Sequence, residues 1–465
     1  MYKKIVFLLI FIVIVGFIGK KTYEGYYLNQ SKTGEIKVVE ATVKSSSLKD
    51  DKVLDIQEID LKNGNILWHV PFHDNDVVTF SISFKGAGKK ADYDGMNGLS
   101  MLLSNTIDEG CGDLSANEVK NFLIDKNIQL SISSGNDNIT INVRTLKKNI
   151  NDCIKFLKTM LKNPTFEEKA MKRVKDSMLQ DFNQSKVNEG YISRDNIMKR
   201  TLGNHPYYTS VDSMIKSLSI IDKKTLNDFL KKHLCRDNSV IASAGNLTNE
   251  EAKEIFLDLL SAIPEKSDIK KVDDASLSFD GKTEHVHVDV PQCVIMFTHP
   301  AVSRHHKDFY NIFMINFMLA GNTFNSRMWN EIREKRGLAY SLGTSISIND
   351  NAHYISGYMG THFKNTKDAI DILKREWEKA SENGFTEEEL ESSKKQLIGT
   401  FAINFDSTKK IVRQMISYKL DGLNANYVNE RNSIINSISL SDINKVAKTF
   451  LERSKLSFGV AGKKS

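Results

Sequence analysis

The sequence is poor in cysteine and proline, and both shortages limit what the protein can be. Its 465 residues include 4 cysteines, which are widely spaced and form no C-x-x-C pair. Their spacing specifies no disulfide pairing and gives no sign of a thiol nucleophile, so small buried apolar side chains are the simplest interpretation. Only 6 prolines occur and 40% of the residues are apolar, which is the composition of a folded protein. At this length we expect two or more domains.

A strong excess of one charge is also missing. Lysine and arginine number 64 against 58 aspartates and glutamates, which gives a formal net charge of +6, and the lysines are scattered along the chain. Without a basic stripe or interleaved aromatic residues, the sequence argues against nucleic acid as a partner. It also contains no G-x-S-x-G motif and no glycine-rich phosphate loop, so two common catalytic signatures are absent.

A long apolar run occurs at the N-terminus, where "MYKK" precedes Ile5 to Gly19 and two lysines follow. A basic start and an apolar core predict an export signal. The run is shorter than the roughly 20 residues of a membrane span, which favours cleavage, but no A-x-A-like site follows it, which favours an uncleaved signal-anchor. We therefore predict a signal-anchor or signal peptide at 1–21, a polar tether at 22–50, and an exported, membrane-anchored protein, on the periplasmic side if bacterial.

The remainder contains a hidden duplication. "FEEKAMKRVKDSMLQDF" at 166–182 corresponds to "FTEEELESSKKQLIGTF" at 385–401, with the same length and the same bounding phenylalanines. The block that begins at Ser217 corresponds in the same way to the block that begins at Ser437, and the separation of the two pairs is nearly constant. Such agreement predicts two copies of one unit, because repeats conserve both the order and the spacing of their elements.

Each copy shows alternating strands first, amphipathic helices next and a closing strand last. This order predicts an α+β fold, a tandem duplication of an α/β sandwich unit with a mainly antiparallel sheet and helices packed on one face. We place the first repeat at 51–264, a polar linker at 265–282 and the second repeat at 283–465.

Two longer strings carry a family resemblance. "LGNHPYYTSVDSM" starts at Leu202 in the first repeat, and "NSRMWNEIREKRGLAYSLGTSISI" starts at Asn325 in the second. With the duplication, these strings resemble the pitrilysin/insulinase superfamily of zinc peptidases, and most closely its mitochondrial processing peptidase-like branch, which has two repeats per chain. The likeness covers roughly Gln57 to Gly462.

In the catalytic members that this chain resembles, the helix after the first strand carries H-x-x-E-H. The two histidines hold Zn²⁺, and the glutamate is the general base for the metal-bound water. Here "GLSMLLSN" places Met101 and Asn105 on the two histidines and Ser104 on the glutamate, and the more distant glutamate ligand falls near Gln180 or Asp181. Thioether, hydroxyl and carboxamide groups neither hold zinc nor act as bases, so we expect no catalytic zinc at this degenerate site.

The second repeat carries a different pair of residues. In the family that the chain resembles, one repeat holds the metal and another supplies an arginine and a tyrosine, and "REKRGLAY" from Arg333 to Tyr340 matches that pair. We expect Arg333 near the end of a helix that Gly337 breaks, and Tyr340 at the start of the next strand. A guanidinium and a phenol can then stabilise the oxyanion that forms on a substrate carbonyl. In the alternative, Arg333 pairs with a neighbouring glutamate and Tyr340 packs in the core.

The resemblance implies a zinc-less partner subunit of a heteromeric metallopeptidase that acts on peptides. Arg333 and Tyr340 would assist a homologous H-x-x-E-H subunit that holds the Zn²⁺, while this chain binds no metal and an extended peptide adds to a sheet edge. The alternative is a non-catalytic scaffold or binding subunit of a membrane-associated complex. A third hypothesis, a lone hydrolase, depends on His285 and His287, which share one face of a predicted strand but have no evident third metal ligand.

Overall fold

The computed structural model describes residues 23–30, 36–43, 52–62, 64–322 and 325–464, in two compact units, Met1–Lys52 and Val53–Ser465. In the smaller unit, strand β1 (Tyr23–Gln30) pairs antiparallel with β2 (Ile36–Val43), so the predicted tether contains paired strands. The predicted signal or anchor at 5–19 lies outside the described residues. Among the helices that the structure does describe, none is long and apolar enough to span a membrane.

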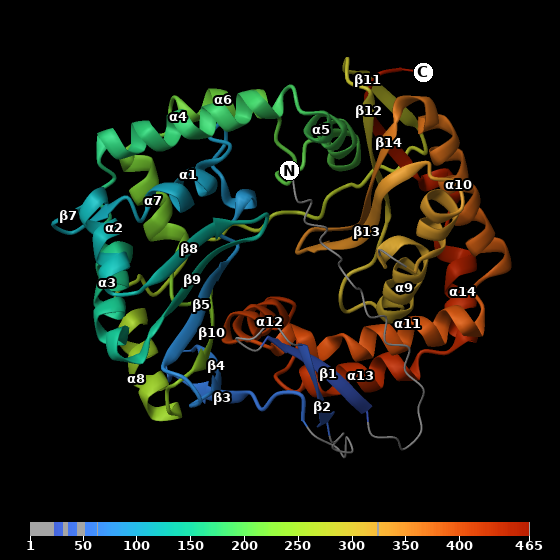
Figure 1. The fold of residues 1–465 in the computed structure, drawn as a ribbon. Coiled ribbons are helices and arrows are strands. Elements are labelled where there is room, and N and C mark those ends of the chain that lie inside the picture. Colours follow the sequence, from blue (N-terminus) through green and yellow to red (C-terminus); the bar gives the residue numbers. More distant parts are fainter. Residues whose placement is uncertain (1–22, 31–35, 44–51, 63, 323–324, 465) are drawn as a thin grey trace, which may run out of the picture. The chain divides into compact units, whose positions relative to one another are not determined.

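The larger unit contains two large sheets, coloured along the chain in Figure 1. The first sheet has the strand order β3-β4-β10-β5-β9-β8, and its β4 and β10 are parallel while the other neighbours are antiparallel. Its strands are β3 (Gln57–Asp60), β4 (Ile66–Pro71), β5 (Val77–Lys85), β8 (Gln129–Ser134), β9 (Asn138–Leu146) and β10 (Ser239–Gly245).

The second sheet has the order β11-β15-β12-β14-β13, with β11 and β15 parallel and the other neighbours antiparallel. Its strands are β11 (Thr283–His287), β12 (Gln292–Pro300), β13 (Ala339–Asn349), β14 (Ala352–His362) and β15 (Ser457–Gly462). Strand for strand, this order and these directions repeat β4-β10-β5-β9-β8 of the first sheet. In both sheets the strand at the far edge, β8 or β13, is therefore equivalent.

Helices and a small pair of strands complete each half of the larger unit. The first half adds α1 (Leu99–Thr106), β6 (Gly110–Cys111), β7 (Leu114–Ser115), α2 (Ala116–Asp125), α3 (Ile150–Lys162), α4 (Glu168–Ser185), α5 (Glu189–Leu202), α6 (Val211–Leu218), α7 (Lys223–His233) and α8 (Asn249–Leu260). The second half adds α9 (Phe309–Asn316), α10 (Thr366–Asn383), α11 (Glu387–Gly399), α12 (Thr408–Leu420), α13 (Tyr427–Ser437) and α14 (Leu440–Phe450). All four cysteines are buried and free, as the sequence predicted.

Helices also cover part of the second face of each sheet, whereas the sequence predicted helices on one face only. Along β4 and β10 the side chains alternate between two cores: Leu67 and Ile241 belong to the core of the first half, and Trp68 and Ala242 belong to a core under α12. Helix α12 comes from the second half and packs on β5 and β10 of the first sheet (Figure 1). A polar contact lies at this interface, since the hydroxyls of Thr79 and Thr408 are 2.8 Å apart.

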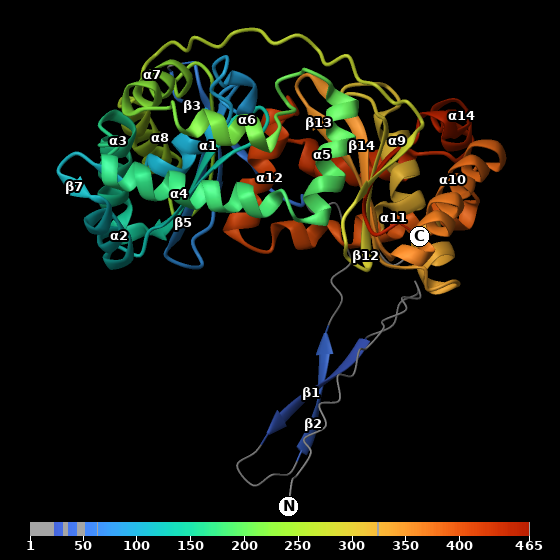
Figure 2. The ribbon, with the colours of Figure 1, turned by 90° about the horizontal axis from the view of Figure 1, so that it is seen from above.

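The exchange is reciprocal, because α5 of the first half packs on β12 and β15 of the second sheet (Figure 2). The Ser193 hydroxyl donates to the carbonyl of Gly459 at 2.8 Å and accepts from the backbone N–H of Met296 at 3.0 Å. A Cβ added at Gly459 would lie 2.6 Å from the backbone oxygen of Ser193, so the close approach of α5 requires glycine at this position.

A buried polar cluster joins the two halves where the β8–β9 and β13–β14 turns meet. The Lys90 ammonium lies 3.1 Å from a carboxylate oxygen of Asp137 and 2.7 Å from one of Asp350. The other Asp137 oxygen accepts from the backbone N–H of Asp350 at 3.1 Å, and the Tyr207 hydroxyl donates to Asp137. We call Lys90, Asp137, Tyr207 and Asp350 the Asp137 cluster.

Candidate functional site

Helix α1 begins at a defined cap close to the edge strand β8. Gly98 has a φ of 88°, a left-handed conformation that favours glycine, and it precedes the helix directly. The Asp92 carboxylate accepts hydrogen bonds from the backbone N–H groups of Gly98, at 2.7 Å, and Ser100, at 2.8 Å. Burial raises the pKa of Asp92 to about 6, against which these hydrogen bonds act. This carboxylate is therefore part of the capping structure of α1.

The degenerate positions Met101, Ser104 and Asn105 lie on α1, as the resemblance implied. Ser104 is buried and its hydroxyl donates to the carbonyl of Ser100 at 2.9 Å, while the Asn105 amide donates to the carbonyl of Met101 at 2.8 Å. Both polar side chains are thus bonded within their own helix. The Met101 side chain is 37% exposed. A thioether, a hydroxyl and a carboxamide do not fit the Zn²⁺ that the family's catalytic members hold at these positions.

Other candidate metal ligands are also not assembled into a site. Gln180 and Asp181 are exposed on α4, a helix that packs beside α1. His285 and His287 lie on β11, and the His285 ring nitrogen Nε2 is 2.9 Å from the carbonyl oxygen of Gly462. In the described part of the chain, no group of three histidine, cysteine, aspartate or glutamate side chains could hold a metal ion.

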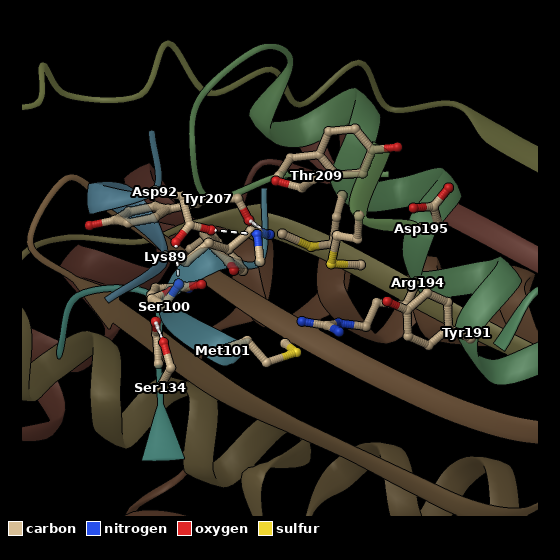
Figure 3. A pocket seen from close by; sticks show the side chains of 17 residues that line it. Lys89, Asp92, Ser100, Met101, Ser134, Tyr191, Arg194, Asp195, Tyr207 and Thr209 are labelled. Atoms are coloured by element: carbon tan, nitrogen blue, oxygen red, sulfur yellow. Dashed lines mark hydrogen bonds between the residues drawn. The ribbon is translucent and has the colours of Figure 1, made fainter. Parts of the chain in front are cut away.

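A cavity of about 200 Å³ lies beside α1, and we call it the α1 cavity. Figure 3 shows its side chains converging from α1, from the 89–92 segment, from the turn after β8 and from α5. Lys89 donates to the carbonyl of Tyr207 at 3.0 Å, and burial lowers the pKa of Lys89 to about 8. Arg194 extends from α5 toward Met101 (Figure 3).

The sequence reasoning missed Lys89, Asp92 and Arg194. It considered the H-x-x-E-H positions alone, and these three residues occupy no position of that motif. The signal for Asp92 was present, because an acidic residue shortly before a glycine and a helix is a capping pattern. Arg194 could not be found in this way, since α5 packs on the sheet of the other half.

Arg333 and Tyr340 are adjacent in the structure. Arg333 lies in a π-helical turn, Trp329–Glu334, and Gly337 follows with a φ of 60°. The Arg333 guanidinium donates to the backbone carbonyl of Tyr340 at 2.8 Å and lies 4.2 Å from the ring centre of Trp329. These contacts hold the cation at the start of β13, the edge strand of the second sheet.

The Tyr340 ring is not packed in the core. It is 48% exposed, and the ring lies against Gly360 of the neighbouring strand. Partial burial raises the pKa of the Tyr340 hydroxyl, with a smaller contribution from the carboxylate of Glu189, so this hydroxyl is a hydrogen-bond donor at neutral pH. Arg333 and Tyr340 are not among the described residues that line the α1 cavity.

Comparisons with known proteins agree with this arrangement. A family model described as "Insulinase (Peptidase family M16)" matches residues 73–212, and one described as "Peptidase M16 inactive domain" matches residues 221–397. The chain is 25% identical to the "Non-peptidase homolog YmxG" of Helicobacter pylori over 82% of this chain and 88% of that protein. It is 20% identical to "Mitochondrial-processing peptidase subunit beta" of Neurospora crassa over 77% of this chain and 78% of that protein.

Solved structures show the same fold. A "peptidase M16 inactive domain" from Pseudomonas fluorescens superposes with a TM-score of 0.82 at 21% identity, covering 89% of this chain and 99% of that one. A chain of Complex III2 from Candida albicans superposes with a TM-score of 0.72 at 15% identity, covering 88% of this chain and 96% of that one. Two matched family models, relatives along most of the chain and a shared fold agree with the degenerate site on α1. The chain belongs to the insulinase (M16) peptidase family, as an inactive homologue.

Proposed function

We propose that this protein is the zinc-less subunit of a heteromeric M16 metallopeptidase that cleaves peptides. A homologous partner subunit with an intact H-x-x-E-H motif would hold the Zn²⁺ and its attacking water. Arg333 and Tyr340 of this chain would donate hydrogen bonds to the substrate carbonyl and stabilise the oxyanion in the transition state. A relative that is itself a subunit, the processing-peptidase subunit of Neurospora crassa, supports a role as a partner chain.

The observation that carries this proposal is the geometry of Arg333 and Tyr340. The backbone carbonyl of Tyr340 and the Trp329 ring hold the guanidinium, while about half of the Tyr340 ring stays exposed. The exposed part of the ring leaves the Tyr340 side chain accessible to a group outside the chain. The pair therefore offers two donors from one rigid turn to a group outside the chain.

The first sheet also offers an edge for a peptide. Strand β8 has the sequence "QLSISS", which contains no charged residue and no proline, and it pairs with β9 alone. Protective charges and prolines usually prevent strand addition at exposed edges. Their absence from β8 supports binding of an extended peptide by main-chain hydrogen bonds.

Replacing Tyr340 by Phe tests the catalytic role. The change removes one hydroxyl from a half-exposed ring, so folding and assembly should be unaffected, and kcat of the assembled complex should fall about 100-fold. Tyr358→Phe is the matched control, because Tyr358 is 46% exposed and its ring lies against Gly343 of β13. We expect this variant to retain kcat within about twofold. Size-exclusion chromatography would establish that both complexes assemble.

The same experiment addresses the scaffold alternative. If the Tyr340→Phe complex assembles and cleaves peptide at the rate of the unchanged complex, Tyr340 has no catalytic role. A scaffold or binding subunit would then be the better description. Arg333→Gln provides a second variant, although this substitution also removes the hydrogen bond from the Arg333 guanidinium to the Tyr340 carbonyl.

Export and membrane anchoring through residues 5–19 belong to the same proposal. They depend on the apolar run and its flanking lysines in the sequence. Cell fractionation tests them, because an anchored and exported chain sediments with membranes and is cut by protease added outside the cytoplasmic membrane. Recovery of the chain in the cytoplasmic fraction would contradict the anchoring.

A further inference from the structure

The α1 cavity contains one cation without a counterion. Arg194 makes no hydrogen bond or ion pair with any residue that the structure describes. Its side chain extends from α5 into the cavity toward Met101 (Figure 3). The equivalent helix of the other half, α12, carries Arg413 at the same sixth position, and Arg413 does not line this cavity. Of these two equivalent arginines, only Arg194 lines the α1 cavity.

The carboxylates near Arg194 already have other partners. Both oxygens of Asp92 accept backbone N–H groups at the start of α1. Asp195 faces the hydroxyl of Tyr208, whose pKa is raised to about 12 by burial and by this carboxylate. Lys89 adds a second positive charge, and burial lowers its pKa to about 8. The carboxylates of Asp92 and Asp195 act against this lowering of the pKa, and the guanidinium of Arg194 acts with it. Two neighbouring cations in a partly enclosed space favour an anion between them.

The rest of the lining combines apolar side chains with tyrosines and small polar residues, and the cavity is small. The thioether side chains of Met101, Met198 and Met214 line the cavity. Its volume of about 200 Å³ lies below the roughly 300 Å³ at which pockets for drug-sized ligands begin. The space therefore suits one amino-acid residue that combines a carboxylate with an apolar group, and methionine adapts to different side-chain shapes.

The edge strand β8 leads to this cavity. Its last residue, Ser134, lines the cavity together with Gly135 and Asn136 of the following turn. A peptide that pairs with β8 would thus extend into the cavity at one end. If the peptide runs parallel to β8, either its C-terminal carboxylate or the acidic side chain of its last residue arrives there.

We propose that the α1 cavity is a carboxylate-binding site in which Arg194 and Lys89 hold the acidic group of a peptide lying on β8. The inference deepens the proposed peptide-binding function by naming the part of the peptide that this chain recognises. Arg194 is the principal ligand, because its guanidinium fork can hold both oxygens of a carboxylate. The position of a lost zinc site would then serve to bind the end of a peptide.

Calorimetric titration of the full-length chain, without a partner, tests the proposal. The probes are three acetylated hexapeptides: TVSVTL with a free carboxylate, TVSVTL as its C-terminal amide, and TVSVTE as its C-terminal amide. We expect the free carboxylate or the glutamate peptide to bind about tenfold more tightly than the uncharged amide. Tighter binding of the peptide with the free carboxylate would identify a C-terminal carboxylate as the ligand. Tighter binding of the glutamate peptide would identify an acidic side chain.

Arg194→Gln should abolish this preference, so that all three peptides bind alike. Arg413→Gln is the matched control and should keep the tenfold preference, because it removes an exposed helical arginine from the equivalent position of α12. Equal affinities for the charged and uncharged peptides in the unchanged chain would overturn the proposal. So would an unaltered preference in Arg194→Gln, or failure of all three peptides to bind at about 1 mM.

The result is separable from the proposed catalytic role. Loss of the carboxylate preference in Arg194→Gln is measured on the chain alone, whereas Tyr340→Phe is measured as kcat of the complex. A chain that binds carboxylates but contributes nothing to kcat would support this site and contradict the peptidase role. A Tyr340-dependent complex whose isolated chain shows no carboxylate preference would do the reverse.

Discussion

The buried His233 makes the stability of the chain depend on pH. The His233 ring is buried against Phe229, with 4.2 Å between ring centres, and against Tyr93. Both ring nitrogens lack a hydrogen-bond partner among the described residues. Burial lowers the pKa of His233 to about 4, while the carboxylate of Asp268 acts in the opposite direction. The imidazole is therefore neutral in the folded chain at neutral pH.

The stability contribution of His233 is present above its unfolded pKa of about 6.5 and is lost as the pH falls toward 4, because the unfolded chain binds the proton first. Between pH 7 and pH 5 the free energy of unfolding should fall by about 2 kcal/mol through this group. In His233→Phe that share of the pH dependence should vanish, and urea denaturation at both pH values measures it. An identical pH dependence in the variant and the unchanged chain would contradict the account.

At the level of single residues, the sequence predicted the degenerate positions on α1 but not the residues that surround them. Met101, Ser104 and Asn105 were placed correctly on one helix, because helix periodicity and a short motif are local properties. The internal bonding of Ser104 and Asn105 follows from the same periodicity. Arg194 belongs to a helix more than 80 residues further along the chain, and its approach to α1 depends on tertiary packing that no local pattern contains.

The exchanged helices are the main feature at the scale of elements. Helix α5 can lie against β15 because Gly459 has no side chain where the Ser193 carbonyl approaches. A methyl group there must displace backbone rather than a flexible side chain, and overpacking of this kind costs about 1–3 kcal/mol. We therefore expect Gly459→Ala to lower the free energy of unfolding by about 2 kcal/mol in chemical denaturation.

Gly399→Ala is the matched control for this prediction. Gly399 ends α11, and a Cβ at this position meets no atom within 4 Å. Alanine has a higher helix propensity than glycine, so the control should be neutral or stabilise the chain by up to about 1 kcal/mol. Equal effects of the two substitutions would show that the contact between α5 and β15 is not tight.

The sequence predicted the central strands and most of the helices, because their alternation and amphipathicity are clear. The strands near 77–85, 138–146, 292–300 and 352–362 were all expected. The strand that begins near Tyr340, β13, was expected as well, whereas the edge strand β8 was not, since its six residues include only two apolar ones, Leu130 and Ile132. The second covered face of each sheet was also missed: small and polar residues such as Ala242 and Thr79 face the exchanged helix, and they resemble a solvent-exposed face in the sequence.

At the scale of the whole chain, the Asp137 cluster joins the two halves of the larger unit. The Asp137 carboxylate is nearly fully buried and interacts with Lys90, Tyr207 and the backbone of Asp350. Asp137→Ala leaves Lys90 paired with Asp350. It removes the carboxylate that accepts from the buried Tyr207 hydroxyl, and an unsatisfied buried donor costs about 1–3 kcal/mol. Asp137→Ala should therefore lower the free energy of unfolding by about that amount.

A double-mutant cycle with Lys90→Met provides the check. If the two groups act as a pair, the double variant should lose less stability than the two single variants together, with a coupling of at least about 1 kcal/mol. Strict additivity would mean that Lys90 and Asp137 stabilise the chain independently. Because Lys90 and Asp137 both belong to the first half, this coupling measures the strength of the pair that contacts Asp350 of the second half.

The duplication itself links all of these features to the proposed function. The first half carries the degenerate positions on α1 and has a free edge at β8, and the second half presents Arg333 and Tyr340 at the start of the equivalent edge strand β13. The central claim is that this chain holds no catalytic zinc and assists a subunit that does. That claim concerns the distribution of metal between two chains, so it can be measured directly.

The most direct measurement is the zinc content of the purified chain and of its complex with the H-x-x-E-H partner, determined by atomic mass spectrometry after dialysis. The account predicts no bound zinc in this chain alone and one zinc ion per pair in the complex, all of it lost when the partner's motif is mutated. One tightly held zinc ion per chain in the isolated protein would contradict the account.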